Sequence, residues 1–97
     1  MAKPAFLCER TPDGALKFRG ELTIFAAEEL RQCLLQFRRD GGVSVVDLAE
    51  VDHVDGAAAQ IFRALQKSEP EPLTFRRTTE LVRQNLLFCG FKPEQFE

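Results

Sequence analysis

Few residues of this chain combine into an arrangement that could catalyse a reaction. His53 is the one histidine among 97 residues, and no serine stands in a Gly-x-Ser-x-Gly setting, so Ser-His catalysis has little support. The sequence has no phosphate-binding glycine motif of the GxxxxGK or GxGxxG kind, and Gly41-Gly42 follows an expected helix instead of leading into one. We therefore expect a chain that is not an enzyme and that binds no cofactor.

Four acidic residues lie close together after a strongly β-prone run. The carboxylates of Asp47, Glu50, Asp52 and Asp55 could in principle bind a hard cation. Asp47 and Asp55, however, stand where a loop and a helix need capping. We expect Glu50 and Asp52 to be solvated, and we predict no metal site.

The three cysteines are also candidates for chemistry. Cys8, Cys33 and Cys89 are odd in number and widely spaced, without a CxxC pair. Because the chain has one histidine, a Cys/His zinc site would have too few ligands at workable spacing. Each cysteine occupies a place where a small apolar residue would fit, so we expect buried, reduced thiols.

Length and composition favour one globular domain over residues 1–97, with hydrophobic residues at 44% and charged residues at 29%. A formal net charge of -2 gives no reason to expect binding to nucleic acid or to an anionic membrane. No apolar run approaches the roughly 20 residues that span a bilayer, and residues 1–4 lack the apolar region of a secretory signal. We expect no direct membrane insertion and a cytoplasmic location.

Turn residues and alternating apolar residues predict a hairpin at the start of the chain. Residues 5–9 and 15–19 are apolar-rich runs, and the Thr11-Pro12-Asp13-Gly14 segment between them is typical of a tight turn. A helix follows, with Thr23 placed to cap its start and Asp40-Gly41-Gly42 placed to end it. Its inward stripe is expected to contain Phe25, Ala26, Leu30, Cys33, Leu34 and Phe37.

Strands and helices then alternate. Residues 43–48 are a β-branched run typical of a strand buried on both faces, which would also bury Ser44. Residues 49–56 connect this strand to a helix at about 57–67, and residues 73–76 form a last short strand. The pattern favours an α/β fold in the order β-β-α-β-α-β-α, with helices packed on a mixed sheet.

A third helix is expected near the end of the chain. Thr78 or Thr79 would cap its start, and Gly90 would end it. Its inward residues are expected to be Leu81, Val82, Leu86 and Leu87. Phe91 and Phe96 are expected to fold back onto the core.

Three segments in this order resemble a known family. They are Gly20-Glu21-Leu22, the run from Val43 to Val51, and Val54-Asp55-Gly56-Ala57-Ala58-Ala59. Together they are similar to STAS domains, the group that contains bacterial anti-sigma factor antagonists. The resemblance implies a four-stranded mixed sheet and a switchable docking module. In antagonists of this family, a partner kinase phosphorylates the hydroxyl that follows the motif aspartate, and the phosphate prevents docking.

The chain departs from that pattern at the switch itself. Gly56 occupies the position of the phosphorylated residue, and Thr23 stands where the family often has aspartate. We therefore predict no phosphorylation at Gly56. The resemblance still implies a docking surface, which we expect to contain Asp55, Gly56, Ala57, Ala58, Ala59 and Phe62. A purely structural interpretation also stays open, since Asp caps helices well and small residues let a helix approach a sheet.

The leading hypothesis is a non-catalytic regulator that binds an anti-sigma factor, a related kinase-like protein or a chemotaxis signalling protein. Two alternatives stay open: an accessory subunit of a lipid-transport ABC complex, and a small-molecule or nucleotide sensor. A homodimer is also compatible with the extra aromatic residues Phe88, Phe91 and Phe96, although packing of the tail would explain them equally well.

Overall fold

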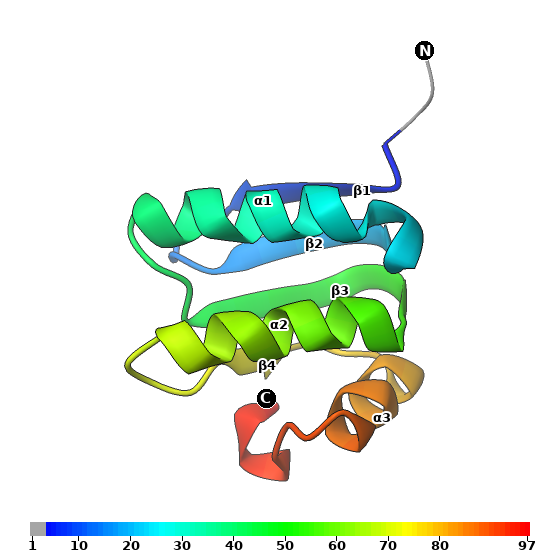
Figure 1. The fold of residues 1–97 in the computed structure, drawn as a ribbon. Helices are drawn as coiled ribbons and strands as arrows, with labels where there is room; N and C mark the ends of the chain where they lie inside the picture. The colour runs from blue at the N-terminus through cyan, green and yellow to red at the C-terminus, as the bar shows by residue number, and fades with distance from the viewer. Residues whose placement is uncertain (1–3) are drawn as a thin grey trace.

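The computed structural model describes residues 4–97 and contains a four-stranded sheet with three α-helices (Figure 1). The strands lie in the order β1-β2-β3-β4; β1 is antiparallel to β2, and β2, β3 and β4 are parallel to one another. The predicted α/β class, mixed sheet and element order are confirmed. In chain order the elements are β1 (Phe6–Arg10), β2 (Leu16–Leu22), the short 3-10 helix η1 (Ile24–Ala26), α1 (Ala27–Arg39), β3 (Val45–Val54), α2 (Gly56–Ser68), β4 (Thr74–Arg76), α3 (Glu80–Phe88) and a second 3-10 helix, η2 (Pro93–Gln95).

The predicted hairpin joins β1 to β2. The N–H of Gly14 donates to the carbonyl of Thr11 at 2.9 Å, and Thr11 N–H donates to the carbonyl of Ala15 at 2.8 Å. Gly14 has φ 91°, a left-handed conformation that glycine adopts without steric cost. The turn therefore closes where the Pro-Asp-Gly segment predicts it.

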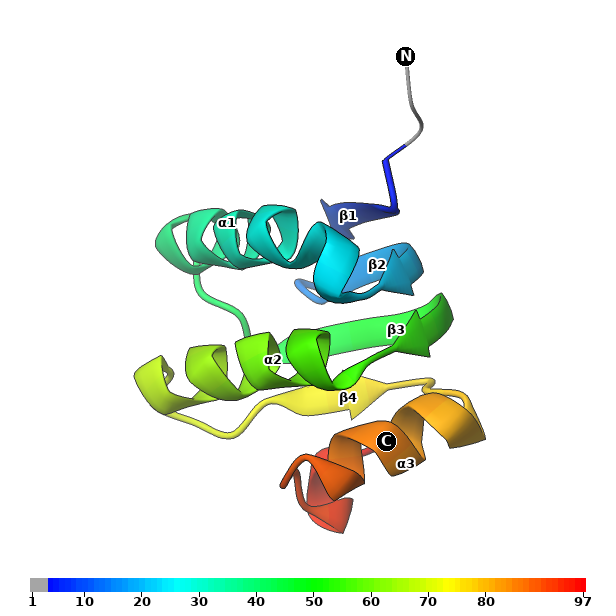
Figure 2. The ribbon, with the colours of Figure 1, turned by 45° about the vertical axis from the view of Figure 1, so that its right-hand side comes forward.

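Helices α1 and α2 lie side by side on one face of the sheet, while α3 lies beside β4 at its edge (Figures 1 and 2). Leu16, Phe18 and Leu22 of β2 are fully buried on the helix side, whereas Lys17 and Arg19 alternate with them toward the other face. A sheet covered on one side buries alternate residues only. This arrangement places the apolar core between the sheet and the two helices.

The central strand β3 is longer than its sequence predicts. It continues to Val54 instead of ending at residue 48, because it pairs with β2 as far as Leu22↔Val54. Within the predicted run, Val46, Asp47 and Leu48 are buried and Val45 is half-buried. In the continuation of the strand, Ala49, Glu50 and Asp52 are exposed. Ser44, expected to be buried, is exposed just before the strand begins. The second half of the strand carries polar residues on the uncovered face of the sheet, so the sequence pattern predicts a loop there.

The start of α1 also differs from its prediction. The 3-10 helix η1 precedes it, and Thr23 makes no side-chain capping bond there. Phe25, expected in the inward stripe, is 93% exposed, whereas Leu30 and Leu34 are buried as predicted. A 3-10 turn rotates its residues relative to the α-helix that follows, so the stripe read at α-helical spacing fails at this end.

Helix α3 begins where the sequence predicts. Thr79 caps it, with its hydroxyl oxygen accepting a hydrogen bond from Val82 N–H at 3.2 Å. Val82 and Leu86 are buried as expected. Leu81 is instead 55% exposed, and Leu87 is only half-buried, so two of the four predicted inward residues are not core residues.

Aromatic rings connect the layers of the core. Phe18 and Phe62 pack edge to face with ring centres 5.8 Å apart, and Phe62 packs on Phe75 at the same distance. The predicted return of the tail is confirmed, because the ring centres of Phe91 and Phe96 lie 4.8 and 5.3 Å from the ring centre of Phe75. Edge-to-face pairs stabilise by about 0.5–1.5 kcal/mol beyond the area that they bury.

Candidate functional site

Asp55 connects the segments that follow the C-terminal ends of β2 and β3 through hydrogen bonds. One carboxylate oxygen, Oδ1, accepts from Ala58 N–H at 3.0 Å and so caps α2, as predicted. The other, Oδ2, accepts from Ile24 N–H at 2.8 Å, and the N–H of Asp55 donates to Leu22 O at 3.1 Å. A single side chain therefore fixes η1 against the start of α2, a contact between residues 31 positions apart.

Gly56, the first residue of α2, is exposed and makes no steric demand for glycine. A Cβ atom built on it meets nothing within 4 Å, and its φ lies outside the left-handed region. Larger side chains at this position would therefore extend into solvent at the positive end of the helix dipole. The position expected for a phosphorylated hydroxyl is accessible, and it carries no hydroxyl.

Two large apolar side chains are exposed next to this helix start. Ile24 is 63% exposed and lies beside Asp55 through the hydrogen bond just described, and Phe25 follows it at 93% exposed. Ala57 is half-buried. We call Ile24, Phe25, Asp55, Gly56 and Ala57 the α2 N-terminal surface. Sequence reasoning missed Ile24 and placed Phe25 in the core.

Three residues of the predicted docking set do not lie at the surface. Ala58, Ala59 and Phe62 are 0% exposed and belong to the core under α2. Their side chains are not available to a partner, so this part of the prediction is corrected. The structural interpretation of the small residues holds for them, since alanines let α2 pack closely on the sheet.

The starts of η1, α2 and α3 lie at the same end of the molecule (Figure 1). Asn85 of α3 donates from Nδ2 to Val54 O at 3.0 Å, which fixes α3 at the end of β3. The exposed Leu81 belongs to the first turn of α3. Apolar groups are therefore presented on two of the three helix starts at this end.

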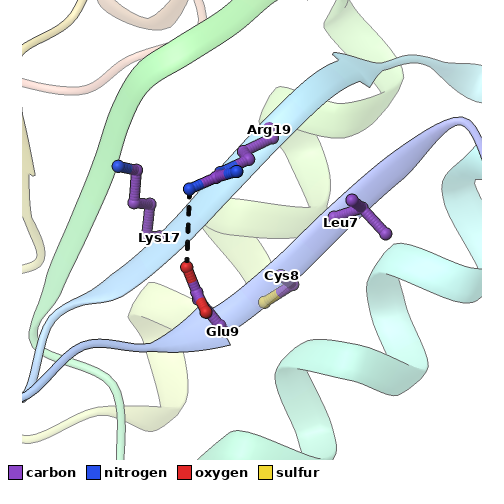
Figure 3. Close-up of a pocket in the computed structure, with 5 residues that line it drawn as sticks. All are labelled: Leu7, Cys8, Glu9, Lys17 and Arg19. Carbon is purple, nitrogen blue, oxygen red and sulfur yellow. Dashed lines mark ion pairs between the residues drawn. The ribbon is translucent and has the colours of Figure 1, made fainter.

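The opposite face of the sheet carries ion pairs (Figure 3). Glu50 forms ion pairs with Lys17 and Arg19: its Oε2 lies 3.0 Å from Lys17 Nζ and 3.0 Å from Arg19 Nε, and Arg19 also lies 3.8 Å from Glu9. The hydrogen bond from Lys17, followed by the charge of Arg19, holds the pKa of Glu50 below its ordinary value of 4.5. A carboxylate kept ionised and paired in this way is poorly suited to act as a general acid.

Asp47 is buried and paired with Arg77, an interaction that sequence reasoning did not find. Its Oδ1 accepts from Ala49 N–H at 2.9 Å, and Oδ2 accepts from the guanidinium of Arg77. The predicted loop cap is wrong, because both Asp47 and Ala49 lie within β3. Arg77 has φ 55°, the one non-glycine residue with a positive φ among residues 4–97. The ion pair holds this strained residue over the carboxylate.

The acidic residues considered for cation binding are engaged in different places. Asp47 pairs with Arg77, Glu50 with Lys17 and Arg19, and Asp55 with two backbone N–H groups. Within residues 4–97, no three metal-ligating side chains gather around one point. Over the same range, no helix is long and apolar enough to cross a bilayer.

An apolar groove of about 330 Å³ lies between α1 and α2. Its apolar lining comes from Leu34, Leu35, Ile61, Ala64 and Leu65. Its volume is at the lower limit of the cavities that hold small molecules. It is separate from the α2 N-terminal surface, because the two share no residue.

The fold is an α/β domain. At the site, Asp55 serves as a helix cap, Asp47 and Glu50 form ion pairs, and the α2 N-terminal surface exposes large apolar side chains. The family model described as "Mlab, STAS domain" matches residues 8–92. The chain belongs to the STAS domain family.

A solved structure supports the same fold. The chain is similar to the anti-sigma factor antagonist SpoIIAA in its unphosphorylated form, with a TM-score of 0.69 and 18% identity. The match covers 96% of this chain and 86% of SpoIIAA. At this level of identity the likeness concerns the fold alone. Comparison with curated proteins found no match.

Proposed function

We propose that residues 1–97 form a single non-catalytic regulatory domain that binds another protein through the α2 N-terminal surface. The observation that carries the proposal is the exposure of Ile24 and Phe25 beside the Asp55 cap. Large apolar side chains held outward on a fixed backbone supply the desolvation that drives protein association. Asp55 fixes that backbone from two sides.

The proposed partner is an anti-sigma factor, a related kinase-like protein or a chemotaxis signalling protein. The similarity to SpoIIAA, an anti-sigma factor antagonist, supports this class. Because Gly56 has no hydroxyl, we propose that docking is not switched by phosphorylation there. We also propose that the domain acts in the cytoplasm and that no cofactor takes part.

Position 56 provides a direct test of the surface. Gly56→Glu places a carboxylate on the proposed contact, where the open space around residue 56 accommodates it without a clash. Negative charge at a helix N-terminus does not destabilise the helix. We expect the variant to keep the unfolding temperature of the wild type and to lose partner binding by at least tenfold.

Gly56→Ala is the matched control, because it adds a side chain to the same open space without charge. A tagged wild-type chain first captures the partner from native cells, and affinities of the purified pair are then measured by calorimetry. Undiminished binding by folded Gly56→Glu would show that the partner does not cover this surface.

Two alternative functions have their own tests. An accessory subunit of a lipid-transport ABC complex would use the same surface for a permanent contact, and capture of an ATPase subunit would identify it. A small-molecule sensor would use the apolar groove between α1 and α2. Thermal shifts with a panel of nucleotides test the sensor hypothesis, since a ligand of the folded state raises its stability.

A further inference from the structure

Strand β1 runs alongside α1, and contacts at both ends define how the two elements are aligned. At one end Arg10 donates from Nη2 to Phe37 O at 3.1 Å, and its guanidinium lies 5.3 Å from the Phe37 ring centre. At the other end Phe6 and Glu29 line the same surface depression. The strand and the helix therefore run in the same direction along this contact.

This alignment places two cysteines opposite each other. Cys8 lies midway between Phe6 and Arg10 on β1, and Cys33 lies midway between Glu29 and Phe37 on α1. Two strand residues advance about 6.6 Å and four helical residues about 6 Å, so the two spacings match. Cys8 belongs to the helix-facing side of β1, since it alternates with the exposed Leu7 and Glu9.

Both residues are half-buried and pack against the same core. Interaction with the Cys33 thiol, followed by burial, raises the pKa of Cys8, and interaction with the Cys8 thiol lowers the pKa of Cys33. Cys33 is thus the better nucleophile of the pair, because the thiolate is the reactive form.

We propose that Cys8 and Cys33 are a redox-active dithiol that a peroxide converts into an intramolecular disulfide. The Cys33 thiolate attacks one peroxide oxygen, breaks the O–O bond and becomes a sulfenic acid, while the other oxygen leaves as hydroxide and takes up a proton. The Cys8 sulfur then attacks the sulfenic sulfur, and the S–O bond breaks with release of water. Two thiols are oxidised, and one hydrogen peroxide is reduced to two waters.

The resulting bond would fasten an edge strand to a helix. β1 pairs with the sheet on one side only, through β2, so it can shift toward α1 as the bond forms. The cross-link closes a loop from residue 8 to residue 33, which limits the unfolded chain and stabilises the fold. It goes beyond the proposed docking function, because none of its atoms belongs to the α2 N-terminal surface.

Cys89 is the third cysteine and provides the background for a test. It lies at the end of α3, where its carbonyl accepts from Arg63, and it belongs to neither β1 nor α1. The Cys89→Ser chain keeps the proposed pair alone. After treatment with hydrogen peroxide we expect its free thiols to fall from two to none, its mass to fall by two hydrogens, and its Tm to rise by roughly 10 °C.

Matched variants keep one thiol each: Cys8→Ser and Cys33→Ser, both in the Cys89→Ser chain. They should show no rise in Tm on oxidation, and the peptide map of oxidised wild type should join the Cys8 and Cys33 peptides. Two free thiols remaining after a peroxide dose that oxidises glutathione would overturn the proposal. A disulfide found only between chains, or one that joins Cys89 in the wild type, would overturn it as well.

Discussion

Replacing Asp55 by alanine removes both hydrogen bonds that fix the start of α2. The lost cap to Ala58 costs about 0.5–2 kcal/mol, by comparison with other N-cap replacements. The lost bond to Ile24 N–H costs about 1 kcal/mol more, since that group is at the surface and regains water. We expect Asp55→Ala to lower the free energy of unfolding by about 1.5–3 kcal/mol, which lowers the Tm by roughly 6–24 °C in a domain of this size.

Urea unfolding followed by circular dichroism measures this loss directly. Asp55→Asn is the intermediate variant, because asparagine caps helices as well as aspartate but offers one acceptor oxygen, so we expect a loss of about 1 kcal/mol. Asp52→Asn is the control: it is an exposed aspartate near the end of β3, and its effect should stay within about 0.5 kcal/mol. Equal stability of Asp55→Ala and Asp52→Asn would refute the assigned role of Asp55.

Two further predictions concern binding and pH. Phe25→Ser should weaken partner binding by at least tenfold without loss of stability. Phe88→Ser, which changes an equally exposed phenylalanine at the far end of α3, should leave the affinity unchanged. Equal losses of affinity in calorimetry would contradict the assignment of Phe25 to the partner contact. Glu50 should titrate below 4.5 in a carbon-detected NMR titration, and Lys17→Met should move its pKa upward. Because the folded-state pKa is depressed, the stabilisation is present above the unfolded value and declines as the pH falls through the folded one; an unchanged titration in Lys17→Met would show that the ion pair does not cause the shift.

Most of the fold follows from local chemistry in the sequence. The Pro-Asp-Gly turn, the apolar stripe of α1 from Leu30 onward and the Thr79 cap each depend on residues within a few positions of one another. The extent of β3 does not, because its second half is held by pairing with β2 from a distant part of the chain. Exposed residues on the uncovered face gave that half the appearance of a loop.

The candidate site was harder to predict, since its contacts join segments far apart in the sequence. Asp55 is recognisable as a helix cap, but its second bond to Ile24 depends on how β2 ends. α-Helical spacing predicts Phe25 in the core, but that spacing does not hold across the 3-10 turn in which Phe25 lies. The proposed pairing of Cys8 with Cys33 depends on the alignment of β1 on α1, which no local pattern reveals.

At the start of α2, the residue that stabilises the fold and the residue at the centre of the proposed contact are different. The hydrogen bonds that fix this corner belong to the carboxylate and backbone of Asp55, while position 56 faces open space and contributes no contact that the fold requires. A hydroxyl at position 56 can therefore be gained or lost without a steric cost to the fold. Glycine there leaves the helix start without a hydroxyl, so in the proposed function the contact stays available at all times. Under that proposal, control comes from the abundance of either protein or from a change elsewhere in the domain.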